Sequence, residues 1–108
     1  MQSLNAADQA RQTGLAAAVR AHRAGRLREA VAGYEALLRR TPDDADILQL
    51  LGLALAQLGR CADAVAFLGR SLELTPDRPT VLLNLAQAVR SRLAPRPTGP
   101  AAQAPDRP

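Results

Sequence analysis

The chain has 108 residues, of which 47% are hydrophobic and 2% aromatic, and nearly all of its apolar residues are Ala, Leu and Val. A chain of this length and composition can bury one core and favours helices over sheets, so we expect a single all-α unit. The formal net charge of +4 comes from arginines scattered among ten acidic residues, which gives little support to a nucleic-acid-binding surface.

The cysteine count and the hydropathy of the chain indicate the cellular compartment and whether a membrane span is expected. Cys61 is the only cysteine, so the chain has no internal disulfide, and a reducing cytoplasm is the compartment that we expect. Residues 1–20 carry charged and polar side chains where a signal peptide needs an apolar stretch. The longest apolar-rich stretch, residues 47–58, is well short of the roughly 20 residues that cross a bilayer, so we expect no membrane span.

The spacing of apolar residues predicts helices, and glycines and prolines mark where the helices end. The first predicted helix covers residues 11–24, with residues 1–10 as an N-terminal extension, and Gly25 ends it. The second covers residues 27–40 and stops before Pro42.

The remaining helices follow the same plan. Residues 44–58 form the third, whose first turn carries acidic side chains that suit the positive end of the helix dipole, and residues 61–74 form the fourth. Pro79 is suited to the first turn of a fifth helix that ends near Leu93. Residues 94–108 contain five prolines, and we expect this Pro- and Ala-rich tail to be disordered.

Much of the chain is repeated at an offset of 34 residues. The residues that recur identically are Gly25-Arg26 as Gly59-Arg60, Ala30-Val31-Ala32 as Ala64-Val65-Ala66, Leu38 as Leu72, and Thr41-Pro42-Asp43 as Thr75-Pro76-Asp77. The offset reaches a third copy through the small residues Ala18, Gly52 and Ala86, which we expect where helices approach closely. A bundle of unrelated amphipathic helices explains the helices but not these identities.

The repeated residues resemble the tetratricopeptide repeat, whose 34-residue signature is W-x2-L-G-x2-Y, then A-x3-F, then P. The second copy matches best, with Leu48, Leu51-Gly52, Leu55, Ala64, Leu68 and Pro76 at the signature positions. The first copy keeps Ala30, Tyr34 and Pro42, and the third supplies Leu82, Leu85, Ala86 and Val89 without a second helix. The resemblance implies a short α-solenoid of antiparallel helix pairs, with repeats at residues 11–44 and 45–78 and an unpaired helix at residues 79–93.

The resemblance also implies that the first helix of each repeat lines a concave groove that binds a peptide or helix of a partner protein. The residues that match this face are Leu15, Val19, His22 and Arg23 in the first copy, Gln49, Leu53 and Gln57 in the second, and Leu83, Asn84, Gln87 and Arg90 in the third. The ligand implied is an apolar or amphipathic segment whose acidic residues meet Arg23 or Arg90. The alternative is that the leucines only complete the packing of a short solenoid.

The chain lacks the grouped side chains that catalysis or metal binding requires. Its one histidine and one cysteine, His22 and Cys61, fall on different predicted helices, and we interpret them as a solvated residue at the groove edge and a packed thiol. Asp43, Asp44 and Asp46 stand at a helix start, where they complement the dipole, and no calcium-binding loop follows. We therefore expect no enzyme activity, no cofactor and no metal.

The fifth helix has no partner helix, and we expect Val81 and Ala88 on its uncovered side. An uncovered apolar stripe favours a homo-oligomer or docking on a larger protein. The function predicted is that of a cytoplasmic, bacterial-type scaffold or adaptor. One alternative is a regulatory segment of a larger enzyme, because arrays resembling these repeats also occur ahead of glycosyltransferase and sulfotransferase domains. A second and less favoured alternative is a nucleic-acid-associated basic protein.

Overall fold

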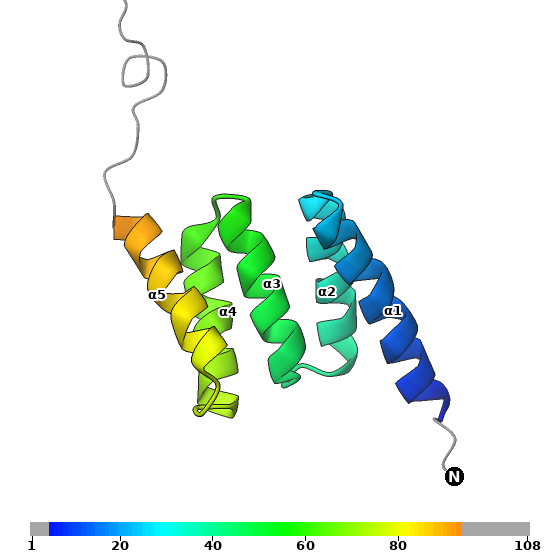
Figure 1. Cartoon of the computed structure of the whole chain (residues 1–108). Coiled ribbons are helices and arrows are strands. Elements are labelled where there is room, and N and C mark those ends of the chain that lie inside the picture. Colours follow the sequence, from blue (N-terminus) through cyan, green and yellow to red (C-terminus); the bar gives the residue numbers. More distant parts are fainter. Residues whose placement is uncertain (1–4, 94–108) are drawn as a thin grey trace, which may run out of the picture.

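The computed structural model describes residues 5–93, and within this range the chain forms five α-helices and no strand (Figure 1). The helices are α1 (Ala6–Arg23), α2 (Leu27–Arg40), α3 (Ala45–Gln57), α4 (Cys61–Leu74) and α5 (Pro79–Leu93). The predicted all-α fold is confirmed, and α2, α4 and α5 have the predicted bounds. The tail predicted at residues 94–108 lies outside the described residues.

Side-chain caps set the starts of α1 and α3. The Asn5 side chain accepts a hydrogen bond of 2.8 Å from the N–H of Asp8, so α1 begins at Ala6, well before the predicted start at residue 11. At the start of α3, the Asp44 carboxylate accepts a hydrogen bond of 3.3 Å from the N–H of Ile47. The acid predicted to begin this helix is therefore its N-cap.

Glycines end α1 and α3. Gly25 and Gly59 have φ angles of 81° and 86°, a left-handed conformation that residues with a Cβ rarely adopt. The N–H of the residue after each glycine bonds to a carbonyl in the last turns of the helix. For Gly25, the N–H of Arg26 donates a hydrogen bond of 2.9 Å to the carbonyl of Ala21. Equivalent turns in both repeats reverse the chain, so that α1 with α2 and α3 with α4 form antiparallel pairs.

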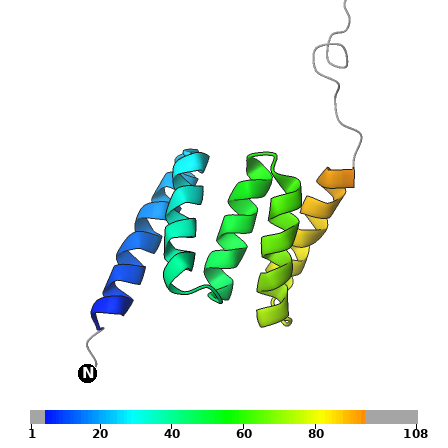
Figure 2. The same cartoon turned by 180° about the vertical axis from the view of Figure 1, so that it is seen from behind.

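The five helices lie in two layers. Figures 1 and 2 show α1, α3 and α5 side by side on one face of the molecule, with α2 and α4 on the opposite face. Each helix packs on its neighbours in sequence, and the contact between α3 and α4 is the most extensive. This arrangement is the predicted short solenoid, in which the first helix of every repeat faces the same side.

The core is centred on α3. Its fully buried side chains, together with those contributed by α2 and α4, include Ile47, Leu48, Leu51, Leu55, Tyr34 and Leu68. Among the polar residues of this region, Ser71 is buried and its hydroxyl donates a hydrogen bond of 2.8 Å to the carbonyl of Ala45, which joins α4 to the start of α3. The second repeat is therefore packed on both sides, whereas the first and fifth helices are at the ends.

Small residues allow helices to approach closely at two of the three predicted positions. A Cβ added to Gly52 would lie 2.6 Å from Cγ of Leu68, and one added to Gly33 would lie 2.9 Å from Cβ of Ala18. Ala18 and Gly52 thus lie at close helix contacts, as predicted. The prediction is wrong for Ala86, which is exposed because no described helix covers that side of α5.

The expected orientation of α5 is also wrong. Val81 and Ala88 are 0% and 1% exposed, and they lie on the side of α5 that faces the rest of the molecule. The apolar side chains that α5 leaves exposed are Leu82, Leu83, Val89 and Leu93. Residues 81 and 88 share one helix face at a spacing of seven, and residue 82 lies about 100° further around the helix.

Candidate partner-binding groove

His22 joins three helices at one end of the groove. Its Nε2 lies 2.7 Å from Oε1 of Gln57 on α3, and its Nδ1 lies 3.0 Å from the hydroxyl of Tyr34 on α2. Because the amide oxygen can only accept, Nε2 carries the proton and Nδ1 accepts from Tyr34. His22 is half-buried, and the contacts of both its ring nitrogens with protein groups were not part of the prediction of a solvated edge residue. Its ring also packs edge-on against Tyr34 at 5.8 Å between ring centroids.

The environment of Tyr34 keeps its hydroxyl protonated. Burial raises the pKa of Tyr34 above its usual value, and the positive charge of Arg23 offsets this increase only in part. A protonated hydroxyl can donate to the imidazole, which gives the bridge from α2 through His22 to α3.

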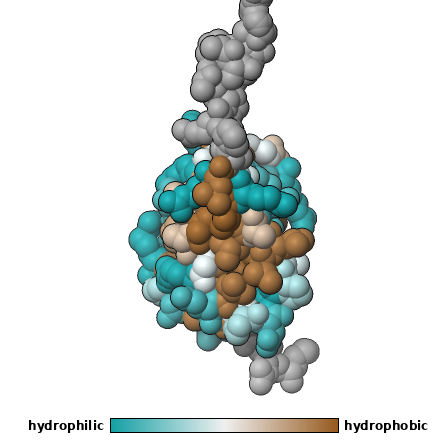
Figure 3. All heavy atoms as spheres, turned by 90° about the vertical axis from the view of Figure 1, so that its left-hand side faces the viewer, coloured by the Kyte–Doolittle hydropathy of each residue, from teal (hydrophilic) through white to brown (hydrophobic). Residues whose placement is uncertain are grey.

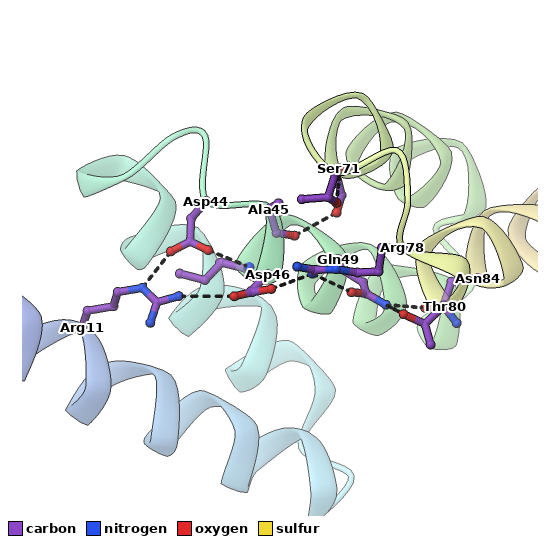
Figure 4. A network of polar contacts seen from close by, with 11 residues as sticks. Arg11, Asp44, Ala45, Asp46, Gln49, Ser71, Arg78, Thr80 and Asn84 are labelled. Atoms are coloured by element: carbon purple, nitrogen blue, oxygen red, sulfur yellow. Dashed lines mark hydrogen bonds and ion pairs between the residues drawn. The ribbon is translucent and has the colours of Figure 1, made fainter.

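A second polar bridge joins α3 to α5. The Gln49 side-chain nitrogen donates to the Thr80 hydroxyl and to Oδ1 of Asn84, both at 3.1 Å, and its oxygen accepts from Arg78 at 3.3 Å (Figure 4). Arg78 also pairs with Asp46 in the first turn of α3. These contacts fill the groove between the N-terminal halves of α3 and α5 with satisfied polar groups.

Ion pairs extend this network to α1. Arg11 donates to Asp44 at 2.7 Å and lies 3.9 Å from Asp46, so Asp46 stands between Arg11 and Arg78. Burial alone would raise the pKa of Asp44, but the hydrogen bonds from Arg11 and from the N–H of Ile47 outweigh it and lower the pKa. The same hydrogen bond with Asp44 raises the pKa of Arg11. The acids therefore fix the relative positions of the first helices.

An open cleft of about 420 Å³ lies between the C-terminal halves of α3 and α5, and Gln57, the partner of His22, is one of its lining residues. Its lining residues are Leu53, Ala56, Gln57, Leu68, Asn84, Gln87, Ala88, Arg90 and Ser91. Leu53 and the two small alanines provide an apolar floor, with Leu68 of α4 beneath it. The remaining side chains are polar, and Arg90 is the only charged residue among them.

The structure brings five of the eleven predicted groove residues together in this cleft. They are Leu53, Gln57, Asn84, Gln87 and Arg90. Leu15 and Val19 are partly buried and pack against the core. This agrees with the alternative in which the leucines and valines of the first helices serve packing. Arg23 is exposed at the end of α1, and Leu83 is 69% exposed on α5 outside the cleft lining.

The sequence analysis did not identify Leu68 of α4 and Ala88 of α5 as cleft residues. It also did not identify the ion pairs that Arg11 and Arg78 form. One signal was present in the repeat. His22 contacts Gln57, and Gln49 contacts Asn84, both at a separation of 35 residues. Polar residues that are one residue more than the repeat length apart on consecutive first helices therefore face each other across the groove.

Other chemistry finds little support in residues 5–93. No group of three or more His, Cys, Asp or Glu side chains in this range could hold a metal ion. Cys61 is a free, half-buried thiol at the start of α4. None of the helices in the same range is both long and apolar enough to cross a bilayer.

The paired helices, their two layers and the groove along the first helices define an α-solenoid repeat protein. The family model described as tetratricopeptide repeat matches residues 15–79 and residues 50–94. The chain belongs to the tetratricopeptide repeat family, whose members are generally protein–protein interaction modules. No curated protein sequence matches the chain.

Proposed function

We propose that the chain is an adaptor that binds a peptide or helix of a partner protein in the cleft between α3 and α5. The observation that carries this proposal is the open cleft of about 420 Å³, in which an apolar floor lies beside polar groups and one arginine. The ligand therefore presents an apolar side chain to the floor and polar atoms to the rim.

The rim favours a ligand that supplies hydrogen-bond acceptors. The side-chain oxygens of Gln57 and Asn84 already accept hydrogen bonds from His22 and Gln49. Their amide nitrogens remain as donors, because within residues 5–93 neither has an acceptor. Arg90 adds further donors, and no acid of the described range forms an ion pair with it. A carboxylate or a peptide carbonyl satisfies these donors, which supports an acidic apolar segment as the ligand.

A random peptide library displayed on phage tests this proposal. The wild-type chain should enrich peptides in which an apolar residue is adjacent to Asp or Glu. Leu53→Asp places a charge on the floor and should lose these peptides, and Arg90→Glu should weaken them by about tenfold or more. Leu83→Asp is the matched control, since Leu83 is exposed on the same helix layer but outside the cleft.

Each variant should keep the wild-type circular dichroism, which shows that the helices are intact. Peptides without acidic residues, or peptides that bind Leu53→Asp and Arg90→Glu as well as the wild type, would contradict the proposed site.

The other functional readings of the sequence stay predictions. Self-association through α5 is tested by the molar mass of the chain in solution at high concentration. A regulatory role within a larger enzyme is tested by reading the neighbouring coding sequence for a catalytic domain. Binding to nucleic acid would show as a steep loss of affinity for oligonucleotides with rising salt.

A further inference from the structure

The repeat allows α5 to be compared with α3 residue by residue. Gly52 of α3 packs against α4, and Leu48 and Leu55 lie on the same helix face at spacings of four and three. These three positions occur again on α5 at the offset of 34, as Leu82, Ala86 and Val89. Leu48 and Leu55 are fully buried, whereas Leu82 is 56% and Val89 is 36% exposed. Figure 3 shows the resulting apolar surface at this end of the molecule. No helix among residues 5–93 covers it.

We propose that this outer face of α5 is a docking site for an amphipathic helix of another protein, which lies on α5 as α4 lies on α3. The site is separate from the α3–α5 cleft, because the outer face and the cleft lie on different sides of α5. The interface between α3 and α4 describes the occupant: Leu68 packs against Gly52, and the carbonyl of Ala64 lies close by. The arriving helix thus carries a small residue and, four positions later, a larger apolar one.

The charges in the last turn of α5 indicate which side chains the adjacent end of the arriving helix carries. The last turn of α5 carries Arg90, which lines the cleft, and Arg92, which lies outside the cleft lining and forms no ion pair within the described range. An antiparallel helix begins beside this turn. Both second helices of the chain have an acid in their first turn, Glu29 in α2 and Asp63 in α4. An acid at that place in the arriving helix pairs with Arg92 and also suits its own helix dipole.

A second copy of the chain fits this site less well. The helices of the required type, α2 and α4, already bury their small and large apolar residues against the core. A second α5 offers an exposed apolar stripe but no acidic residue to meet Arg92. The occupant is therefore a helix of a different polypeptide, with an acidic first turn and an Ala-x3-Leu-like apolar face.

The probe is a peptide with the sequence of residues 60–75, labelled with a fluorophore and carrying Cys61→Ser. Titrated with the full-length chain, it should bind saturably and become more helical. Val89→Glu in the chain should weaken binding by about tenfold or more, because it places a charge in the apolar contact. Asp63→Arg in the peptide should also weaken binding, whereas Leu53→Asp in the cleft should leave it unchanged.

Several results would overturn the proposal. A peptide that does not bind saturably, or that binds the Val89→Glu variant as tightly as the wild type, removes the site. Loss of binding in Leu53→Asp with retention in Val89→Glu assigns the peptide to the cleft. A wild-type dimer that Val89→Glu converts to a monomer, without peptide binding, assigns the face to a second copy. Binding that appears only after removal of residues 94–108 assigns the face to that segment.

Discussion

Two glycines of the second repeat should respond in opposite ways to the same substitution. Gly52→Ala adds a Cβ that would lie 2.6 Å from Cγ and 2.9 Å from Cδ2 of Leu68, and 3.3 Å from the carbonyl oxygen of Ala64. Leu68 is completely buried, so it has little room to move away. Gly69→Ala, in the middle of α4, adds a Cβ with no atom within 4 Å.

The magnitudes follow from two competing terms. Alanine in place of glycine inside a helix stabilises it by about 0.5–1 kcal/mol, and Gly69→Ala should show this gain in full. Overpacking a tight core costs about 1–3 kcal/mol, so Gly52→Ala should be destabilising by about 1–2 kcal/mol after the same helix gain. Because the helix gain is common to both variants, they should differ by the overpacking cost of about 1–3 kcal/mol in the free energy of unfolding.

Urea denaturation followed by helical circular dichroism measures this difference directly. For a domain of this size, about 1 kcal/mol corresponds to about 4–8 °C in the melting temperature, so thermal unfolding gives an independent reading. If Gly52→Ala stabilised the chain as Gly69→Ala does, then α3 and α4 would not approach closely at Gly52, and the packing described for the second repeat would be wrong.

The remaining predictions concern the polar bridges and the cleft. His22→Ala should lower the free energy of unfolding by about 1–3 kcal/mol, because it leaves the buried Tyr34 hydroxyl without its partner. The exposed Arg20→Ala should change it by less than about 0.5 kcal/mol. Because the folded pKa of Asp44 is lowered, its stabilising contribution is present above the unfolded pKa and is lost as the pH falls through the folded pKa. The stability difference between wild type and Asp44→Asn should thus shrink as the pH falls below the ordinary aspartate pKa of about 3.9, and a constant difference in acid titration of unfolding would refute it. Any acidic peptide selected on the cleft should bind Arg90→Glu less tightly than the wild type in fluorescence titrations, and high salt should weaken wild-type binding and reduce the difference between the two.

The repeat explains why the helices could be predicted from the sequence. Helical spacing, together with Gly25 and Gly59, defined the turns within each repeat, and both glycines adopt the left-handed conformation that the turns require. The start of α1 was missed because its signal is a single capping residue, Asn5, outside the repeated pattern. A local hydrogen bond of this kind leaves no trace in apolar periodicity.

The error on α5 had a signal that was not used. At the offset of 34, Val81 corresponds to Ile47 and Ala88 to Ala54, and both residues of α3 are fully buried. The offset thus assigns Val81 and Ala88 to the inner face. Treating α5 only as a helix without a partner gave the opposite orientation.

The groove was predicted in part because the repeat identifies which helices face the same side. The repeat does not show which groove side chains bond to each other, since those contacts depend on the angle between consecutive repeats. The structure shows that His22 and Gln49, two of the predicted groove residues, form bridges between helices. Their partners Gln57 and Asn84 line the cleft together with Leu53 and Arg90.

The central claim is that the α3–α5 cleft binds a partner protein. A pull-down from cell lysate with the wild-type chain, Leu53→Asp and Leu83→Asp tests it most directly, provided that all three give the same circular dichroism. The account predicts a protein that the wild type and Leu83→Asp retain and Leu53→Asp loses. A protein retained equally by all three would contradict it and place the interaction outside the cleft.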